Sequence, residues 1–72
     1  MKFEKSSLVG FVKAQRKALG LTQIELSQKS GVGLRFIRDL EQGRTGLRLN
    51  KIEQVLSLFG ATLVPLKKKD IK

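Results

Sequence analysis

Apolar residues recur at helical spacing in four stretches of this 72-residue chain, and a glycine follows each stretch. The four stretches lie at about residues 7–19, 22–30, 33–42 and 49–59. A period near 3.6 residues places the apolar positions of each stretch on one side of a helix, where they can pack against the other helices. The pattern therefore predicts an all-α domain of four short helices.

The first and last helices are each predicted to present one apolar stripe to the core. The first should begin at a serine cap, Ser6 or Ser7, and end before Gly20. Its apolar stripe consists of Leu8, Phe11, Val12, Ala18 and Leu19, and that of the last helix of Ile52, Val55, Leu56 and Phe59. Gln15 interrupts the first stripe, where an apolar residue would complete it. We expect the last helix to pack beneath the third and to fix its tilt.

Residues 22–43 carry the most specific local pattern. Thr22 and Glu25 have the spacing of a capping box, which starts a helix. Gly31 then interrupts the helical pattern where a left-handed turn residue costs least. An inward stripe follows, made of Val32, Phe36, Ile37 and Leu40, and Gly43 ends it. Two helices joined by a short turn containing glycine form a helix-turn-helix, a motif whose second helix lies in the DNA major groove.

The outward face of the second motif helix carries side chains suited to base edges. Arg35 and Arg38 are three positions apart and share one side of the helix, with Leu34 and Gln42 flanking them. Arginine forks onto guanine, and an apolar group suits the methyl group of thymine. These four residues are the predicted base contacts. The alternative is a solvated face on which Arg35 pairs with Asp39 and Arg38 pairs with Glu41 or Gln42.

The charge of the chain fits a polyanionic partner, because 15 Lys and Arg residues against 6 Asp and Glu residues give a net charge of +9. The predicted phosphate contacts are Arg16, Lys17, Thr22, Gln23 and Arg44. Free N–H groups and the helix dipole at the start of the motif also favour a phosphate there. For each of these residues the alternative is a solvated surface position.

Several classes of function are argued against by what the sequence lacks. Without cysteine or histidine there is no basis for disulfides, thiol chemistry or the usual zinc sites, and we expect no cofactor and no enzyme activity. No apolar run approaches the ~20 residues of a membrane span. Lys13 and Arg16 interrupt the only N-terminal stretch that could serve as a secretory signal. We therefore expect a protein of the bacterial cytoplasm, associated with the nucleoid, with neither a membrane nor a small-molecule partner.

Residues 61–66, ATLVPL, form the one stretch that is typical of a strand. A lone strand cannot satisfy its backbone within an all-helical domain, so we expect it to pair with the same strand of a second copy across a two-fold axis. Pro65 has no N–H to donate, so the pairing edge should be the opposite one, of Thr62, Val64 and Leu66. The predicted dimerisation residues are Thr62, Leu63, Val64 and Leu66. The alternative is an extended tail packed on the core.

The whole chain is predicted to be one domain with a thin core, since a chain this short buries only about 60% of its unfolded surface. Within residues 1–72, the helix-turn-helix covers about 22–43 and the dimerisation strand about 61–66. Residues 67–72, KKKDIK, form a basic tail that is expected to be solvated and able to touch phosphates.

The run RKALGLTQIELSQKSGVGLRFIRDLEQGR resembles the Cro/CI-type, or XRE-type, repressor domain, a four-helix, lambda-repressor-like fold. The matching positions are Arg16, Gly20, Leu21, Thr22, Gln23, Leu26, Gly31, Val32, Ile37, Leu40, Glu41 and Gly43. The last helix ends in Leu-Phe-Gly at Phe59 and Gly60 and is followed by a hydrophobic stretch, which resembles the HipB-type antitoxin branch of that family.

This resemblance implies a homodimer that represses its own operon at palindromic operators and that binds and restrains a HipA-like serine/threonine kinase toxin. By position, it implies that Gln23 holds a phosphate and that the four predicted base contacts face the DNA. The chain departs from many relatives at Gln15 and Ser27, and from some at Gly33 and Leu34, where those relatives begin the helix with glutamine. Two other functions stay open: a stand-alone regulator, such as a phage or plasmid repressor without a toxin, and a protein-interaction module with no DNA role.

Overall fold

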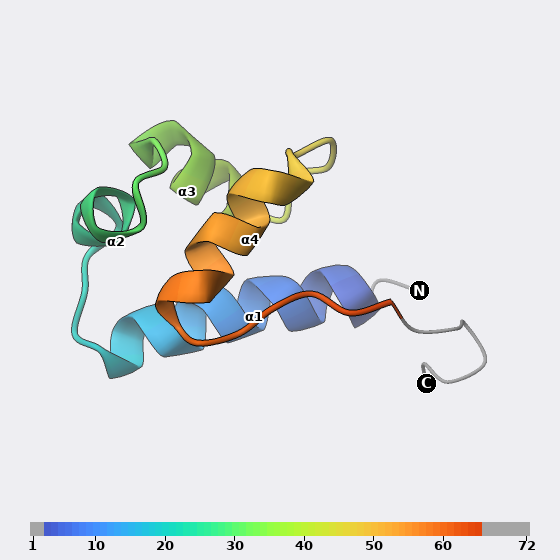
Figure 1. Ribbon diagram of the computed structural model, residues 1–72, viewed down its shortest axis with the longest axis horizontal. Coiled ribbons are helices and arrows are strands. Elements are labelled where there is room, and N and C mark those ends of the chain that lie inside the picture. The colour runs from blue at the N-terminus through green and yellow to red at the C-terminus, as the bar shows by residue number, and fades with distance from the viewer. Residues whose placement is uncertain (1–2, 66–72) are drawn as a thin grey trace.

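The computed structural model describes residues 3–65, and this part of the chain forms four helices (Figure 1). They are α1 (Phe3–Ala18), α2 (Gln23–Ser30), α3 (Leu34–Glu41) and α4 (Leu49–Leu58). The predicted all-α class is confirmed, and the helix-turn-helix is formed by α2 and α3. One boundary was wrong: α1 begins at Phe3, so Ser6 and Ser7 lie inside the helix and do not cap it.

The start of α2 is fixed by the predicted capping box. The Thr22 hydroxyl oxygen accepts a hydrogen bond from the Glu25 backbone N–H at 3.1 Å, and the Thr22 N–H donates to Glu25 Oε1 at 2.8 Å. Each residue thereby satisfies a backbone donor of the first turn that has no partner within the helix. The same two residues therefore determine where the first motif helix begins.

The turn between α2 and α3 depends on a glycine and on a serine. Gly31 has a φ of +83°, in the left-handed region that glycine adopts without strain. The Ser27 hydroxyl donates to the Val32 carbonyl oxygen at 2.7 Å, so the residue that replaces the more usual alanine fits and also bonds the turn. From α4, Gln54 Nε2 donates to the Ser30 carbonyl oxygen at 2.9 Å. The turn is thus held from both sides.

The core is formed by one buried apolar cluster to which all four helices contribute. Its members are Val12, Leu26, Val32, Ile37, Leu40, Ile52, Val55 and Leu56. The predicted inward stripes of α3 and α4 are confirmed, with Phe36 and Phe59 packed against the cluster. The stripe of α1 was partly wrong, since Phe11 is 38% and Leu19 is 56% exposed, and Ala18 is exposed as well. Because α1 ends at Ala18, Leu19 lies in the following turn and leaves the helical period.

The expected packing of α4 beneath α3 is present only in part. The close backbone contacts of α4 are mainly with α2, whereas those of α3 are with α1 and α2. The apolar residues of α3 and α4 nevertheless belong to the same buried cluster. The tilt of α3 is therefore set from α1, from α2 and through this shared core.

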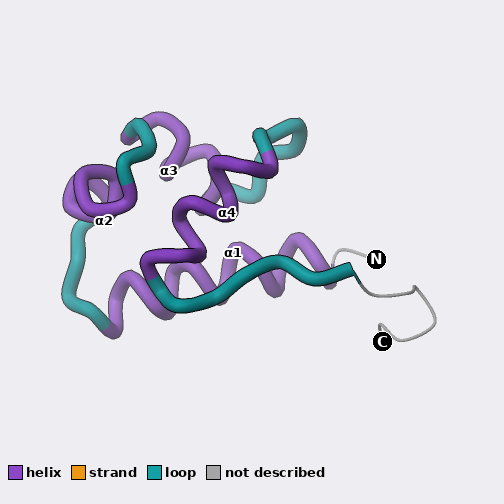
Figure 2. The backbone as a smooth tube through the Cα atoms, viewed as in Figure 1, coloured by secondary structure: helices purple, strands orange, loops and turns teal. Residues whose placement is uncertain are grey.

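After α4 the chain continues as a loop, and residues 61–65 contain no strand in the described part of the chain (Figure 2). Ala61 and Leu63 pack against the core, and the Leu63 N–H donates to Glu53 Oε2 at 3.0 Å. Leu66 lies outside the described residues, as does the basic tail. Pairing of this segment between two copies stays a prediction.

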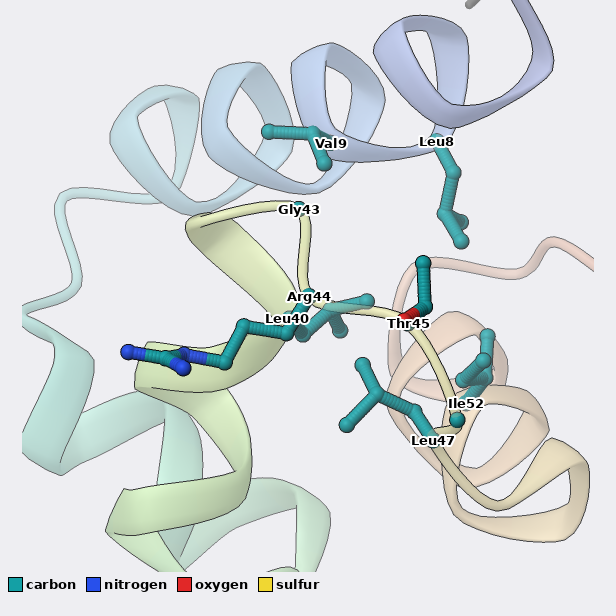
Figure 3. Close-up of a pocket in the computed structure, with 9 residues that line it drawn as sticks. Leu8, Val9, Leu40, Gly43, Arg44, Thr45, Leu47 and Ile52 are labelled. Carbon is teal, nitrogen blue, oxygen red and sulfur yellow. The ribbon is translucent and has the colours of Figure 1, made fainter.

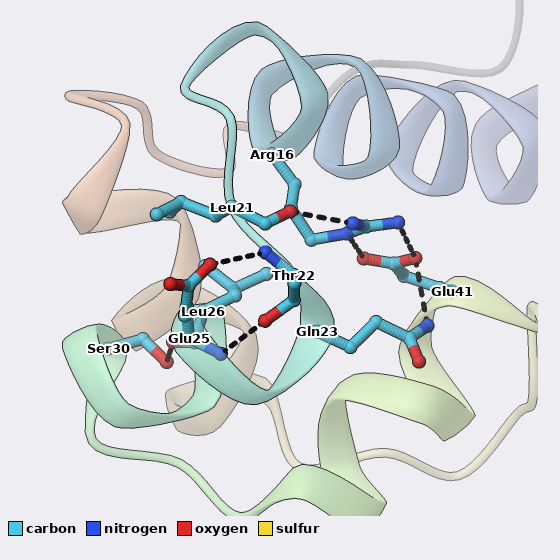
Figure 4. A network of polar contacts seen from close by, with 8 residues as sticks. All are labelled: Arg16, Leu21, Thr22, Gln23, Glu25, Leu26, Ser30 and Glu41. Atoms are coloured by element: carbon cyan, nitrogen blue, oxygen red, sulfur yellow. Dashed lines mark hydrogen bonds and ion pairs between the residues drawn. The ribbon is translucent and has the colours of Figure 1, made fainter.

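A buried ion pair joins α1 to the end of α3 (Figure 4). Arg16 Nε and Nη2 bind the two carboxylate oxygens of Glu41 at 2.7 and 3.1 Å, while Arg16 Nη1 donates to the Leu21 carbonyl oxygen at 2.8 Å. Gln23 Nε2, at the start of α2, donates to Glu41 Oε1 at 3.1 Å. Glu41 is only 3% exposed. These contacts link α1, α2 and α3 at one point, and their forked geometry fixes direction as well as distance.

Replacing Glu41 with alanine should destabilise the domain by about 3–5 kcal/mol, because it leaves the Arg16 guanidinium buried without its counter-charge. Thermal and urea unfolding followed by circular dichroism measure this loss. Glu25→Gln is the control, since glutamine also serves in a capping box, and it should change the stability far less. A Glu41→Ala protein as stable as the parent would contradict a structural role for the pair.

Two glycine substitutions should change the stability of the protein in opposite directions. Gly31→Ala should destabilise the protein by about 1–2 kcal/mol, because alanine at positive φ is strained and its Cβ would lie 2.9 Å from Gln54 Nε2. Gly10→Ala, inside α1 with open space around an added Cβ, should stabilise it by roughly 0.5–1 kcal/mol. The same unfolding experiment compares both, and equal shifts of one sign would contradict the described turn.

Candidate nucleic-acid interface

The side of α3 that faces away from the core carries the predicted base contacts. Arg35, Arg38 and Gln42 are exposed, and Leu34 is half-buried beside them. Ile37, on the opposite side of the helix, is completely buried. The structure therefore presents these polar side chains together on one solvent-facing surface, while contact with bases stays a prediction.

The two arginines of this surface have different surroundings. The side chain of Arg35 is 86% exposed, and its Nε lies 3.5 Å from Asp39 Oδ1, so the predicted alternative pairing is present. Arg38 forms no ion pair with any other residue whose side chain the structure describes. Its alternative pairing with Glu41 was wrong, because Glu41 is directed to the interior, where Arg16 binds it. Arg38 is thus free to meet a ligand without first losing an internal partner.

Arg44 is brought beside α3 by the way that helix ends. Gly43, with a φ of +77°, allows its own N–H to donate to the Leu40 carbonyl oxygen and the Arg44 N–H to donate to that of Asp39, which is a Schellman motif. The Arg44 side chain returns to the helix, where its Nε lies 3.2 Å from Asp39 Oδ1 and 3.3 Å from Gln42 Oε1. Arg44 therefore extends the positive surface of α3.

The start of α2 lies close to the end of α3, since Gln23 reaches Glu41 (Figure 4). Thr22 is exposed, and although its hydroxyl oxygen accepts the capping bond, the hydroxyl hydrogen can still donate to a phosphate. Gln23 is half-buried, with one amide hydrogen directed to Glu41. Lys17 is exposed at the end of α1. Thr22 and Gln23 therefore place further donors near the end of α3, and Lys17 adds an exposed charge at the end of α1.

Arg16 is the predicted phosphate contact that the structure does not favour. Its side chain is only 14% exposed, and all three guanidinium nitrogens bond within the protein, two to Glu41 and one to Leu21. A phosphate would have to displace these bonds from a buried site. These contacts give Arg16 a role in supporting α3, and its contact with a phosphate stays a prediction that this geometry does not favour.

Sequence reasoning missed this pair, although the spacing contained a signal. Arg16 lies four residues after Val12, and Glu41 four residues after Ile37, so each charged residue continues the buried side of its helix. A cation and an anion that both fall on core-facing positions are each costly to bury alone. Their pairing could have been predicted on that ground.

Two hollows border the surface described above. One, of about 320 Å³, lies between α1 and the loop after α3, and its lining is mainly apolar (Figure 3). The Arg44 side chain points away from it, so this hollow offers little for binding a charged ligand. The other, also about 320 Å³, lies between the starts of α3 and α4. Its charged lining residues are Arg35, Asp39, Arg48 and Lys51. The positive surface therefore continues from α3 to α4.

Other types of site find no support in the part of the chain that the structure describes. Over that range, no three side chains of the metal-binding types gather where they could hold an ion. Within the same residues, no helix is long and apolar enough to cross a membrane.

Comparison with known proteins agrees with this geometry. A family model described as Helix-turn-helix (HTH_3) matches residues 12–66. The chain is 44% identical over 52 residues to the "Uncharacterized HTH-type transcriptional regulator y4mF" of Sinorhizobium fredii (strain NBRC 101917 / NGR234), a match that covers 72% of this chain and 68% of the relative. No solved structure matches the chain. The matched residues include the whole of α2, α3 and α4, and the chain therefore belongs to the Cro/CI-type (XRE) helix-turn-helix family of DNA-binding transcriptional regulators, which are not enzymes.

Proposed function

We propose that this regulator is a sequence-specific repressor that binds palindromic operators as a dimer, with α3 of each copy in one of two successive major grooves about 34 Å apart. The observation that carries the proposal is the two-sided character of α3. Ile37 and Leu40 on one side are buried in the core, and Arg35 and Arg38 on the other side are exposed. A helix held in this way presents its arginines at a fixed angle to the groove.

Affinity in this proposal comes mainly from charge. The chain carries a net charge of +9, the Arg44 side chain lies beside α3 at Asp39, and Lys17 is exposed at the end of α1. Thr22 and Gln23 lie beside a helix N-terminus, where a phosphate is favoured. Binding releases counterions from the duplex, so the affinity should fall steeply as salt rises.

Dimerisation is proposed to use the segment after α4, and the bonds of that segment support the predicted edge. The Ala61 N–H donates to the Leu56 carbonyl oxygen at 2.9 Å, and the Leu63 N–H donates to Glu53. If the segment is extended, alternate residues point their N–H groups to opposite edges. The edge of Thr62 and Val64 would then be open to a second copy, and Val64 is 66% exposed.

We further propose that the dimer is the antitoxin of a HipBA-like type II system and that it binds a HipA-like kinase. What supports this part is the resemblance in residues 22–43 and in the ending of the last helix. Co-purification of the chain from its native host tests it, because a kinase should accompany an antitoxin. A protein that purifies alone, with a preferred operator, would instead be the stand-alone regulator.

Replacing Arg38 with alanine should lower the ratio of operator to random-DNA affinity by about fivefold or more, since a good bidentate base contact gives about 1–3 kcal/mol of discrimination. Arg35→Ala should lower the ratio in the same way. Fluorescence anisotropy with both duplexes at one salt concentration measures it. Lys17→Ala is the control and should weaken binding to both duplexes equally. An unchanged ratio in both arginine variants would contradict base contact by α3.

Replacing Val64 with proline should turn dimers into monomers, because it removes an N–H from the proposed pairing edge. Light scattering coupled to size-exclusion chromatography measures the mass. Val64→Thr is the matched control, since it keeps the N–H and the branched side chain, and it should remain dimeric. A dimeric Val64→Pro protein would argue against pairing through this segment.

A further inference from the structure

Asp39 places a negative charge in the middle of the positive surface of α3. Its Oδ1 lies 3.5 Å from Arg35 Nε and 3.2 Å from Arg44 Nε. The Asp39 side chain is 22% exposed, whereas those of Arg35 and Arg44 are 86% and 61% exposed. The carboxylate therefore lies beneath two guanidinium groups that reach further into solvent.

Asp39 is expected to add little to the stability of the folded protein. Ion pairs with such exposed arginines contribute little to folding, because water and salt screen them. The other acid of α3, Glu41, is buried and bonded to Arg16, so it does not share this surface. A carboxylate on a face that meets DNA repels phosphates and reduces affinity for any duplex. A favourable effect of Asp39 must therefore lie in how strongly the protein distinguishes one DNA sequence from another, since specificity is a difference of affinities.

The geometry of the pairs indicates how Asp39 can create that difference. Its contact with Arg35 is through Nε, which leaves the two terminal nitrogens of that guanidinium for another partner. Those nitrogens form the fork that binds O6 and N7 of guanine. The 3.5 Å contact draws the Arg35 guanidinium towards Asp39 on the helix face, so a guanine placed beside this pair meets the two terminal nitrogens close to the position from which they can bind it.

We propose that Asp39 is a specificity-determining residue, which orients Arg35 for guanine and penalises DNA that offers no guanine there. On such DNA the Asp39 carboxylate repels nearby phosphates and base acceptors, and no contact between Arg35 and guanine offsets that cost. This inference rests on the proposed function, because it requires that α3 reads base edges.

The test begins with the full-length protein and a pool of random duplexes, from which it selects its preferred site. Anisotropy titrations at fixed salt then compare that site with a scrambled duplex of the same length. Asp39→Asn should reduce the ratio of the two affinities about tenfold, mainly by tightening the binding of the scrambled duplex. A ratio within twofold of the parent would overturn the proposal.

Two further variants separate this role from a general charge effect. Glu25→Gln removes the same charge from the start of α2 and keeps the capping box, so its ratio should stay within twofold of the parent. A drop equal to that of Asp39→Asn would overturn the proposal. If Asp39→Asn folds poorly by circular dichroism, Asp39→Ser takes its place with the same expectation.

A double-mutant cycle tests the proposed link to Arg35. In an Arg35→Ala background, Asp39→Asn should change the ratio by less than threefold, because the side chain that it orients is gone. A full tenfold change in that background would overturn the orienting role. If the parent protein selects no preferred site from the pool, the proposed function itself fails, which is a result distinct from a selective parent with a silent Asp39→Asn variant.

Discussion

The bond between Arg16 and Glu41 is the constraint on which the arrangement of this small domain depends. It joins residues 25 positions apart, and its forked geometry fixes both the distance and the direction in which α1 meets the end of α3. A buried charge without its partner is costly, so the pair disfavours packings that separate these two helices. Gln23 adds the start of α2 to the same point. Three helices are thereby placed relative to one another by a single carboxylate.

The functional surface follows from that constraint. Because Glu41 and the apolar stripe of α3 are directed inward, the opposite side of the helix is left to Arg35, Arg38 and Gln42. The left-handed glycine after α3 then returns Arg44 to the same side. Charged residues thus serve in two ways in this domain. One buried pair fixes how α1 and α3 are placed, and a set of exposed cations is available to a polyanion.

The features of the fold that depend on short-range contacts could be predicted from the sequence. The capping box at Thr22 and the turn at Gly31 were correctly located because short-range bonds and backbone sterics determine them. The interior position of Arg16 and the packing of α4 against α2 were not predicted. Both depend on which helices contact one another, and the helical period of the apolar residues does not determine those contacts. The start of α1 was missed since a serine can cap a helix or lie within it. The strand predicted at residues 61–66 depends on a second chain, which local pattern can suggest but not establish.

In the proposed complex, two copies of α3 meet two successive major grooves. Methylation protection of guanine N7 on a selected duplex reports this contact, because N7 is exposed only in the major groove. Two clusters of protected guanines are expected, related by two-fold symmetry and separated by about 10 base pairs, with both clusters lost in Arg35→Ala and Arg38→Ala. Protection of one cluster alone, or of none while the duplex is fully bound, would contradict the proposed complex.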